Sequence, residues 1–135
     1  MILITCVAKN NGILFNNRRV SRDRKVIEDI CEVVGDNEIV INDFSEELFM
    51  AYDNVKIVNT FEGEAEKFCF IEDVQASTIE DKIEKIILYN WNVDYPADTY
   101  FDIDLNEWQL ESEYEFEGFS HKKITRKIYK KGDLV

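Results

Sequence analysis

Short apolar segments rich in β-branched residues alternate with a helical pattern in the first third of the chain. Residues 2–8 (ILITCVA) form one such segment, and the turn signal Asn10-Asn11-Gly12 ends it. After Ser21, a residue type that caps helices, apolar residues recur three and four apart up to Gly35, a residue type that ends them. A second strand is predicted at 38–42. This order of strand, helix and strand predicts a sheet whose first strands are parallel.

The rest of the chain is dominated by predicted strands. Their ranges are 55–59, 67–71, 86–91 and 108–118, while the segment 122–132 fits an edge strand or a helix. Short helices are expected at 45–52 and 78–85, and a loop at 13–20. No linker or repeat divides the chain, so residues 1–135 are expected to form a single domain. The fold class is therefore α/β: a mixed sheet, parallel early and antiparallel at the C-terminal end, flanked by two or three short helices.

Charge is unevenly distributed along this acidic chain. The formal net charge is −12, yet eleven of the sixteen basic residues lie in two segments, five of them in 18–25 and six in 122–131. An acidic surface repels nucleic acid. Nucleic-acid binding is therefore expected only if both basic segments share one face.

The numbers of histidines and cysteines limit the chemistry. His121 is the only histidine, which excludes metal sites built from two or more histidines, and we expect neither a metal nor a cofactor. Cys6, Cys31 and Cys69 are scattered in apolar stretches, as expected for buried thiols in a reducing compartment. No apolar run is long enough for a membrane helix, and the apolar start lacks the features of a signal peptide. We therefore expect a cytoplasmic protein that does not bind membranes.

Several short motifs occur in a fixed order near the two ends of the chain. They are Asn11-Gly12-Ile13 after the first strand, Asn16 or Asn17 in the loop, Asp23 at the helix start, Asp98-Thr99-Tyr100-Phe101, Trp108 and the strand SEYEFEG. This arrangement resembles the dihydrofolate reductase fold. The resemblance implies that Asp23 holds a pterin ring and accepts a hydrogen bond from Thr99, and a partly buried carboxylate does need such donors. Alternatively, Asp23 only occupies the first turn of a helix, where the macrodipole favours it.

The chain departs from that family's pattern where the reductases bind their cofactor. Arg18-Arg19-Val20 replaces a Leu-Pro-Trp motif, and Asn42-Asp43-Phe44-Ser45 replaces a Gly-Arg-x-Thr turn that grips the cofactor phosphate. No glycine lies between Ile71 and Ile83, where the family has a Gly-Gly pair. These differences predict a shortened relative that has lost its dinucleotide half and is not an NADPH-dependent reductase.

A second resemblance concerns the segments RRVSRDR and SHKKITRKIY. They are similar to segments of uncharacterised proteins of Gram-positive bacteria, some of which are labelled ribonuclease Z. That enzyme needs an HxHxDH cluster to hold two zinc ions, and a chain with one histidine cannot form it. The sequence therefore predicts that the protein is not a zinc-dependent ribonuclease.

The first functional hypothesis is a site for a small anionic ligand, such as a nucleotide or a phosphorylated metabolite, in the residual cleft. Its predicted residues are Arg18, Arg19, Arg22, Asp23 and Thr99. The arginines would clamp phosphate, because the planar guanidinium suits bidentate contact. The alternative for the arginines is an ion-pair network with the acidic residues Glu28, Asp29 and Glu32 or with acidic strand positions.

The second hypothesis is a non-enzymatic interaction protein. Acidic residues alternate along one predicted strand and would meet a basic partner, or the basic strand of a second copy in a homodimer; they are Glu107, Glu111, Glu113, Glu115 and Glu117. A serine nucleophile activated by histidine finds no support in the sequence, because Ser120 and His121 are chain neighbours rather than a spaced pair.

Overall fold

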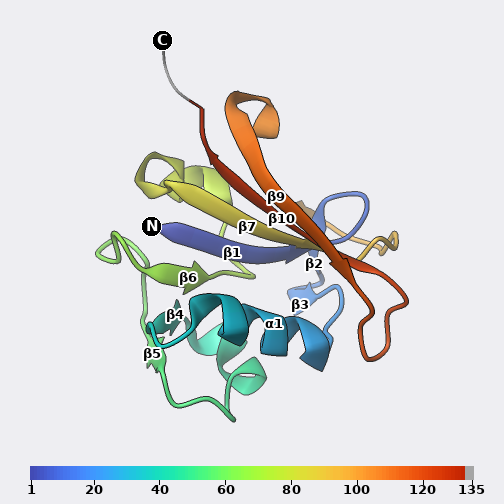
Figure 1. The fold of residues 1–135 in the computed structure, drawn as a ribbon, viewed down its shortest axis with the longest axis horizontal. Coiled ribbons are helices and arrows are strands. Elements are labelled where there is room, and N and C mark those ends of the chain that lie inside the picture. The colour runs from blue at the N-terminus through green and yellow to red at the C-terminus, as the bar shows by residue number, and fades with distance from the viewer. Residues whose placement is uncertain (133–135) are drawn as a thin grey trace.

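A seven-stranded sheet forms the centre of the molecule in the computed structural model, which describes residues 1–132 (Figure 1). Its strands are β1 (Ile2–Val7), β4 (Ile39–Ile41), β5 (Val55–Ile57), β6 (Phe68–Phe70), β7 (Lys85–Asn90), β9 (Trp108–Phe116) and β10 (Ile124–Lys131). A smaller sheet contains β2 (Gly12–Phe15), β3 (Arg18–Arg19) and β8 (Thr99–Tyr100). The helices are α1 (Arg24–Val34) and three 3-10 helices, η1 (Asp43–Leu48), η2 (Ala76–Lys82) and η3 (Leu105–Glu107).

The order of strands in the large sheet is β5-β4-β6-β1-β7-β10-β9. The pairs from β5 to β7 are parallel, and β10 pairs antiparallel with both β7 and β9. This confirms the predicted mixed α/β sheet. The last segment is a strand and not a helix, but it is not the predicted edge: β10 is an inner strand, and β9 is the edge.

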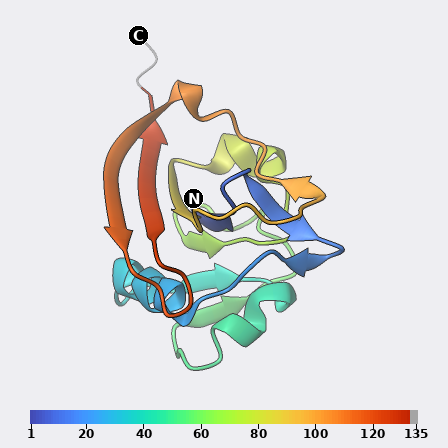
Figure 2. The ribbon, with the colours of Figure 1, turned by 90° about the vertical axis from the view of Figure 1, so that its right-hand side faces the viewer.

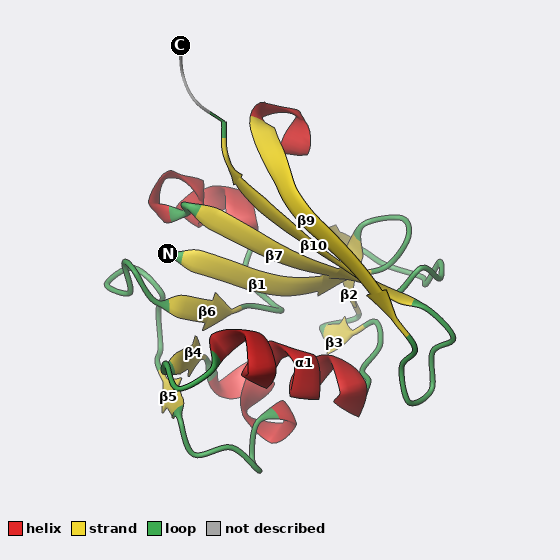
Figure 3. Ribbon diagram, in the orientation of Figure 1, coloured by secondary structure: helices red, strands yellow, loops and turns green. Residues whose placement is uncertain are grey.

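Two apolar cores lie on opposite faces of this sheet. Successive residues of a strand point to opposite faces, so Leu3 and Ile4 of β1 belong to different cores. The core with Ile4 includes the apolar face of α1, whose buried residues are Val26, Ile27, Ile30 and Val34. The core with Leu3 includes residues of η2 and the small sheet. Figure 3 shows α1 lying across the sheet near β6 and β4.

The ends of α1 follow from local side-chain chemistry. Asp23 is the N-cap and accepts a hydrogen bond from the amide of Lys25. Ser21 therefore lies two residues before the cap, and the prediction that it caps the helix was wrong. Gly35 ends the helix as predicted, with a φ of 63° that favours glycine.

Three other predicted segments differ in detail. The expected loop 13–20 contains the β2 and β3 strands, joined by Asn16 and Asn17, whose φ angles of 50° and 61° suit a tight hairpin turn. The helices expected at 45–52 and 78–85 are the 3-10 helices η1 and η2. Within residues 1–132, no helix combines the length and the apolar character that crossing a membrane requires.

Candidate functional site

The carboxylate of Asp23 joins the start of α1 to the loop between β9 and β10, residues 117–123, which we call the hairpin loop. Asp23 Oδ1 accepts from the Phe119 amide at 2.9 Å, and Oδ2 accepts from the Ser120 amide at 2.9 Å. The ring nitrogen Nδ1 of His121 lies 2.8 Å from Oδ2. Figure 2 shows this loop passing beside the start of α1. A carboxylate of the first basic segment thus anchors the loop that leads into the second.

These donors also decide the charge of Asp23. Burial by itself would raise the pKa of this carboxyl group. The hydrogen bonds from the Ser120 amide, the His121 ring and the amides of Phe119 and Lys25 outweigh burial and hold the pKa well below its ordinary value. Asp23 is therefore an ionised acceptor at neutral pH, not a proton donor.

Thr99 lies elsewhere and does not take part in this network. It pairs with Leu14 in the small sheet, and its hydroxyl bonds Asp98 at 3.3 Å. No hydrogen bond joins Thr99 to Asp23 in the part of the chain that the structure describes. The pairing implied by the resemblance was wrong, because the hairpin loop supplies the donors that Asp23 needs.

Arg19 is held by acidic groups of its own chain. Its guanidinium bonds Glu72 at 2.8 Å and also contacts Glu47 and the carbonyl oxygen of Phe44. Arg19 therefore forms ion pairs, as the alternative prediction expects, but with Glu47 and Glu72 rather than with the acidic residues of α1. Arg18 and Arg22 are exposed, and their binding of a ligand stays a prediction.

His121 is the centre of a second set of contacts that the sequence did not reveal. Its Nε2 lies 2.8 Å from Ser21 Oγ and 3.1 Å from the hydroxyl of Tyr95. The indole of Trp91 stacks on the imidazole, with ring centres 4.7 Å apart. Ser21 and His121 are separated by 100 residues, so the only signal in the sequence was that this histidine is unique.

The space around Asp23 consists of two small cavities and one larger pocket. Two cavities border Ser21, each of about 10 Å³, which is close to the room one water needs. A larger pocket of about 300 Å³ lies beside Asp23. Its lining has two arginines, Arg22 and Arg24, against three carboxylates, Asp23, Glu28 and Glu47, so the balance of charge disfavours an anion there.

A pocket of about 600 Å³ lies on the other side of His121. We call it the lysine pocket, and its lining residues are Lys9, Trp91, Asn92, Val93, Tyr95, Ser120, His121, Lys122 and Lys123. Three of them are lysines, and none of these lining residues carries a carboxylate. Lys123 also forms an ion pair with Glu115 at 3.0 Å. Its lining is more basic than that of the pocket beside Asp23, although the protein as a whole is acidic.

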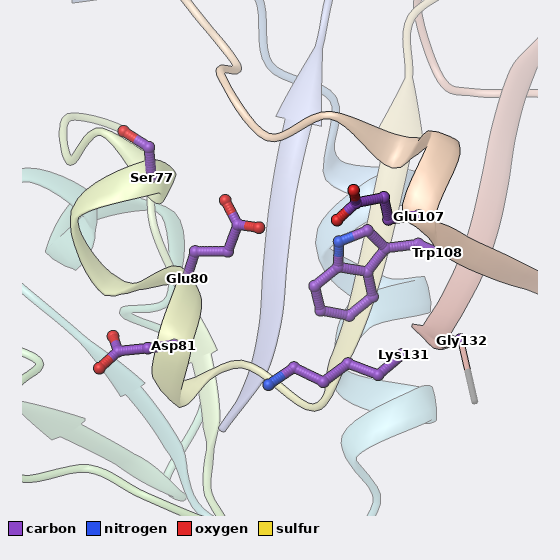
Figure 4. Close-up of a pocket in the computed structure, with 7 residues that line it drawn as sticks. All are labelled: Ser77, Glu80, Asp81, Glu107, Trp108, Lys131 and Gly132. Carbon is purple, nitrogen blue, oxygen red and sulfur yellow. The ribbon is translucent and has the colours of Figure 1, made fainter. Parts of the chain in front are cut away.

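A further pocket, of about 820 Å³, has the opposite character. Glu80, Asp81 and Glu107 line it together with Lys131, and Figure 4 shows the Glu80 carboxylate facing the ring of Trp108 across the opening. Three carboxylates against one lysine disfavour an anionic ligand.

The acidic strand is partly neutralised by lysines of the same chain. Glu111 pairs with Lys85 at 3.4 Å, and Glu115 pairs with Lys123. The basic strand β10 lies beside the acidic strand β9 within one molecule. The two strands therefore pair with each other in a single molecule, and the homodimer stays a prediction.

Comparison with known proteins supports the fold and no more. No protein-family model matches the chain, and no curated protein matches it. Among solved structures, a dihydrofolate reductase from Enterococcus faecalis complexed with NADP(H) and RAB-propyl is similar, with a TM-score of 0.69 and 11% identity. The alignment covers 98% of this chain and 97% of that one. At this identity the likeness shows only that the chain has a dihydrofolate reductase-like fold.

Proposed function

We propose that the protein binds a small anionic ligand, such as a nucleotide or a phosphorylated metabolite, in the lysine pocket. The observation that carries the proposal is the lining of this pocket by Lys9, Lys122 and Lys123 and by no carboxylate. In a chain of net charge −12, such a local excess of positive charge attracts an anion to one place. The proposal keeps the predicted ligand class and moves it away from the arginines.

The position of the pocket in the fold supports this proposal. Lys9 follows the carboxyl end of β1, and residues 91–95 follow the carboxyl end of β7, its parallel neighbour. In open α/β sheets, ligands bind in the crevice outside the carboxyl ends of the strands. The hairpin loop closes the third side, where Lys122 and Lys123 lead into β10.

The backbone at Asn92 is a further feature of this pocket. Asn92 has a φ of 59°, an uncommon conformation for a residue with a side chain, and bonds Lys123 O and Thr125 Oγ1. These bonds tie two walls of the pocket together.

Asp23 supports the site without touching the ligand. Its hydrogen bonds to Phe119, Ser120 and His121 hold the hairpin loop against α1. This loop carries Lys122 and Lys123 next to His121. Asp23 is accordingly a positioning residue, and its loss would loosen one wall of the pocket.

Ligand-induced stabilisation tests the proposal directly. The wild-type protein is heated with nucleoside mono- and diphosphates, sugar phosphates and inorganic phosphate, and the melting temperature is followed for each. We expect at least one organic phosphate to raise the melting temperature in proportion to the logarithm of its concentration. The double variant Lys9→Glu/Lys122→Glu is expected to weaken that binding at least tenfold in calorimetric titration.

The matched control is Lys130→Glu, which changes the charge by the same sign on an exposed residue of β10 outside the pocket. It should leave the affinity within about twofold, since distant exposed charges are screened by salt. Equal loss in the pocket variant and the control, or no stabilisation by any of the anions, would refute the proposal.

The second candidate is an interaction protein acting through the edge strand β9. Leu110 and Tyr114 are exposed on this strand at 46% and 50% of their full surface. An exposed edge with apolar side chains can pair with a strand of a partner. We rank it second, because Glu111 and Glu115 of the proposed acidic face already have lysine partners in the same chain.

A further inference from the structure

Ser21, His121 and Asp23 form a relay of side chains in which each contacts the next. Ser21 Oγ lies 2.8 Å from His121 Nε2, and His121 Nδ1 lies 2.8 Å from Asp23 Oδ2. The side chain of Asp23 is fully buried, and that of His121 is only 7% exposed. The three residues come from the segment before α1 and from the hairpin loop, so neither local sequence nor a helical turn accounts for their alignment.

The order of these contacts assigns the protons. Asp23 is ionised and can only accept, so His121 Nδ1 carries a proton and donates it to Oδ2. In the neutral imidazole, Nε2 is then the acceptor, and the hydroxyl of Ser21 donates to it. Trp91 stacks on the ring and fixes its plane. A serine hydroxyl bonded to a histidine that a carboxylate orients is the arrangement that activates serine as a nucleophile.

We propose that Ser21 is a nucleophile and that the protein hydrolyses a small ester carrying an anionic group. Ser21 Oγ attacks the carbonyl carbon, and its proton passes to His121 Nε2. The bond to the alcohol breaks, and the departing alcohol takes that proton. Water then attacks the acyl-serine and gives its proton to Nε2. Release of the acid returns this proton to Ser21 Oγ. The net reaction converts ester and water into acid and alcohol.

Tyr95 lies between Ser21 and the lysine pocket. Its hydroxyl lies 3.4 Å from Ser21 Oγ and 3.1 Å from His121 Nε2. Tyr95 and His121 line the lysine pocket, whereas Ser21 borders only the two cavities of about 10 Å³, so in this proposal the carbonyl of the ester reaches Ser21 Oγ past the Tyr95 side chain. A tyrosine hydroxyl beside the nucleophile is a donor for the oxyanion that forms during the attack. The substrate class, an ester with an anionic group held by the lysines, rests on the proposed function. The assignment of Ser21 as the nucleophile does not.

A fluorophosphonate probe tests the nucleophile without knowledge of the substrate. Ser21 Oγ would displace fluoride and form a bond to phosphorus, which intact-mass measurement and peptide mapping detect on the full chain. We expect one adduct, at Ser21, and none in Ser21→Ala. Ser112→Ala, which removes an exposed hydroxyl from β9, should label at the wild-type rate. His121→Gln, shown to be folded by circular dichroism, should label at least 100-fold more slowly.

Labelling that is absent, that maps to Ser120 or Tyr95, or that persists in Ser21→Ala would overturn the assignment. Unchanged labelling of folded His121→Gln would also overturn it, because the base would then have no role.

A second measurement separates the nucleophile from the ligand site. The kcat/KM values for the 4-nitrophenyl esters of succinate, which is anionic, and of acetate, which is neutral, are compared. The variant Lys9→Glu/Lys122→Glu should lower the preference for the succinate ester about tenfold. If Ser21 is labelled and this preference is unchanged, the anionic substrate class and the lysine pocket are refuted and the nucleophile stands. If phosphates bind and Ser21 is not labelled, the nucleophile is refuted and the anion site in the lysine pocket stands.

Discussion

Replacing Asp23 with alanine removes the acceptor that joins α1 to the hairpin loop. Loss of an N-cap costs about 1 kcal/mol. The amides of Phe119 and Ser120 each lose a hydrogen bond to a charged group, a loss of about 1.5–3 kcal/mol. Both residues are exposed, so water replaces part of this contact and the lower figure applies. We therefore expect Asp23→Ala to lower the free energy of unfolding by about 4 kcal/mol.

Urea denaturation followed by circular dichroism measures this change. The matched control is Asp104→Ala, because Asp104 is also an N-cap in an extended conformation but, within residues 1–132, accepts only from the amide of Asn106. Its loss should cost about 1 kcal/mol or less. Hydrogen exchange at Phe119 and Ser120 should accelerate in Asp23→Ala and not in the control. If the two variants lose equal stability, the hairpin loop does not depend on Asp23 and the reasoning fails.

Three other predictions concern the same region. Folding lowers the pKa of Asp23 below its ordinary 3.8. The ionised carboxylate therefore contributes its full stabilisation of the fold above that pH, and this stabilisation is lost as the pH falls below it. The difference in free energy of unfolding between wild type and Asp23→Asn should accordingly shrink on acidification. Arg19→Met leaves the buried Glu72 without its cation and should cost about 3 kcal/mol, part of which Glu72→Gln recovers in the double variant. Gly118→Ala would bring a Cβ within 2.6 Å of Asp23 Oδ2 and should lower the free energy of unfolding, measured by urea denaturation, by about 1–3 kcal/mol. The control Gly63→Ala, where an added Cβ would have nothing within 4 Å, should change it by no more than about 0.5 kcal/mol.

Much of the fold could be predicted because its signals are local. The apolar run at 2–8 and the spacing of Val26, Ile27 and Ile30 each follow from the period of a strand or a helix. The type of the short helices η1 and η2 could not be predicted, because the apolar spacing of six or seven residues suits an α-helix and a 3-10 helix equally. The inner position of β10 could not be predicted, because its lysines also suit an edge strand.

The candidate site was predicted only in part. The resemblance to the reductase fold points to Asp23 but pairs it with Thr99, whereas the hairpin loop supplies its donors. Arg19 was expected to bind phosphate or to form ion pairs, and only the folded chain brings Glu72 beside it. The lysine pocket was not predicted at all, because its lining comes from three separate loops.

The sequence by itself determined the order of α1 and the strands of the large sheet, the acidic composition with its two basic segments, and the limits that a single histidine sets on metal chemistry. Each depends on residue type or on spacing within one segment. Only the tertiary structure decided that His121 meets Asp23 across 98 residues and Ser21 across 100. Such contacts form when β10 pairs with β7 and the hairpin loop comes to lie beside α1. No local pattern encodes that approach, because it results from packing both faces of the sheet at once.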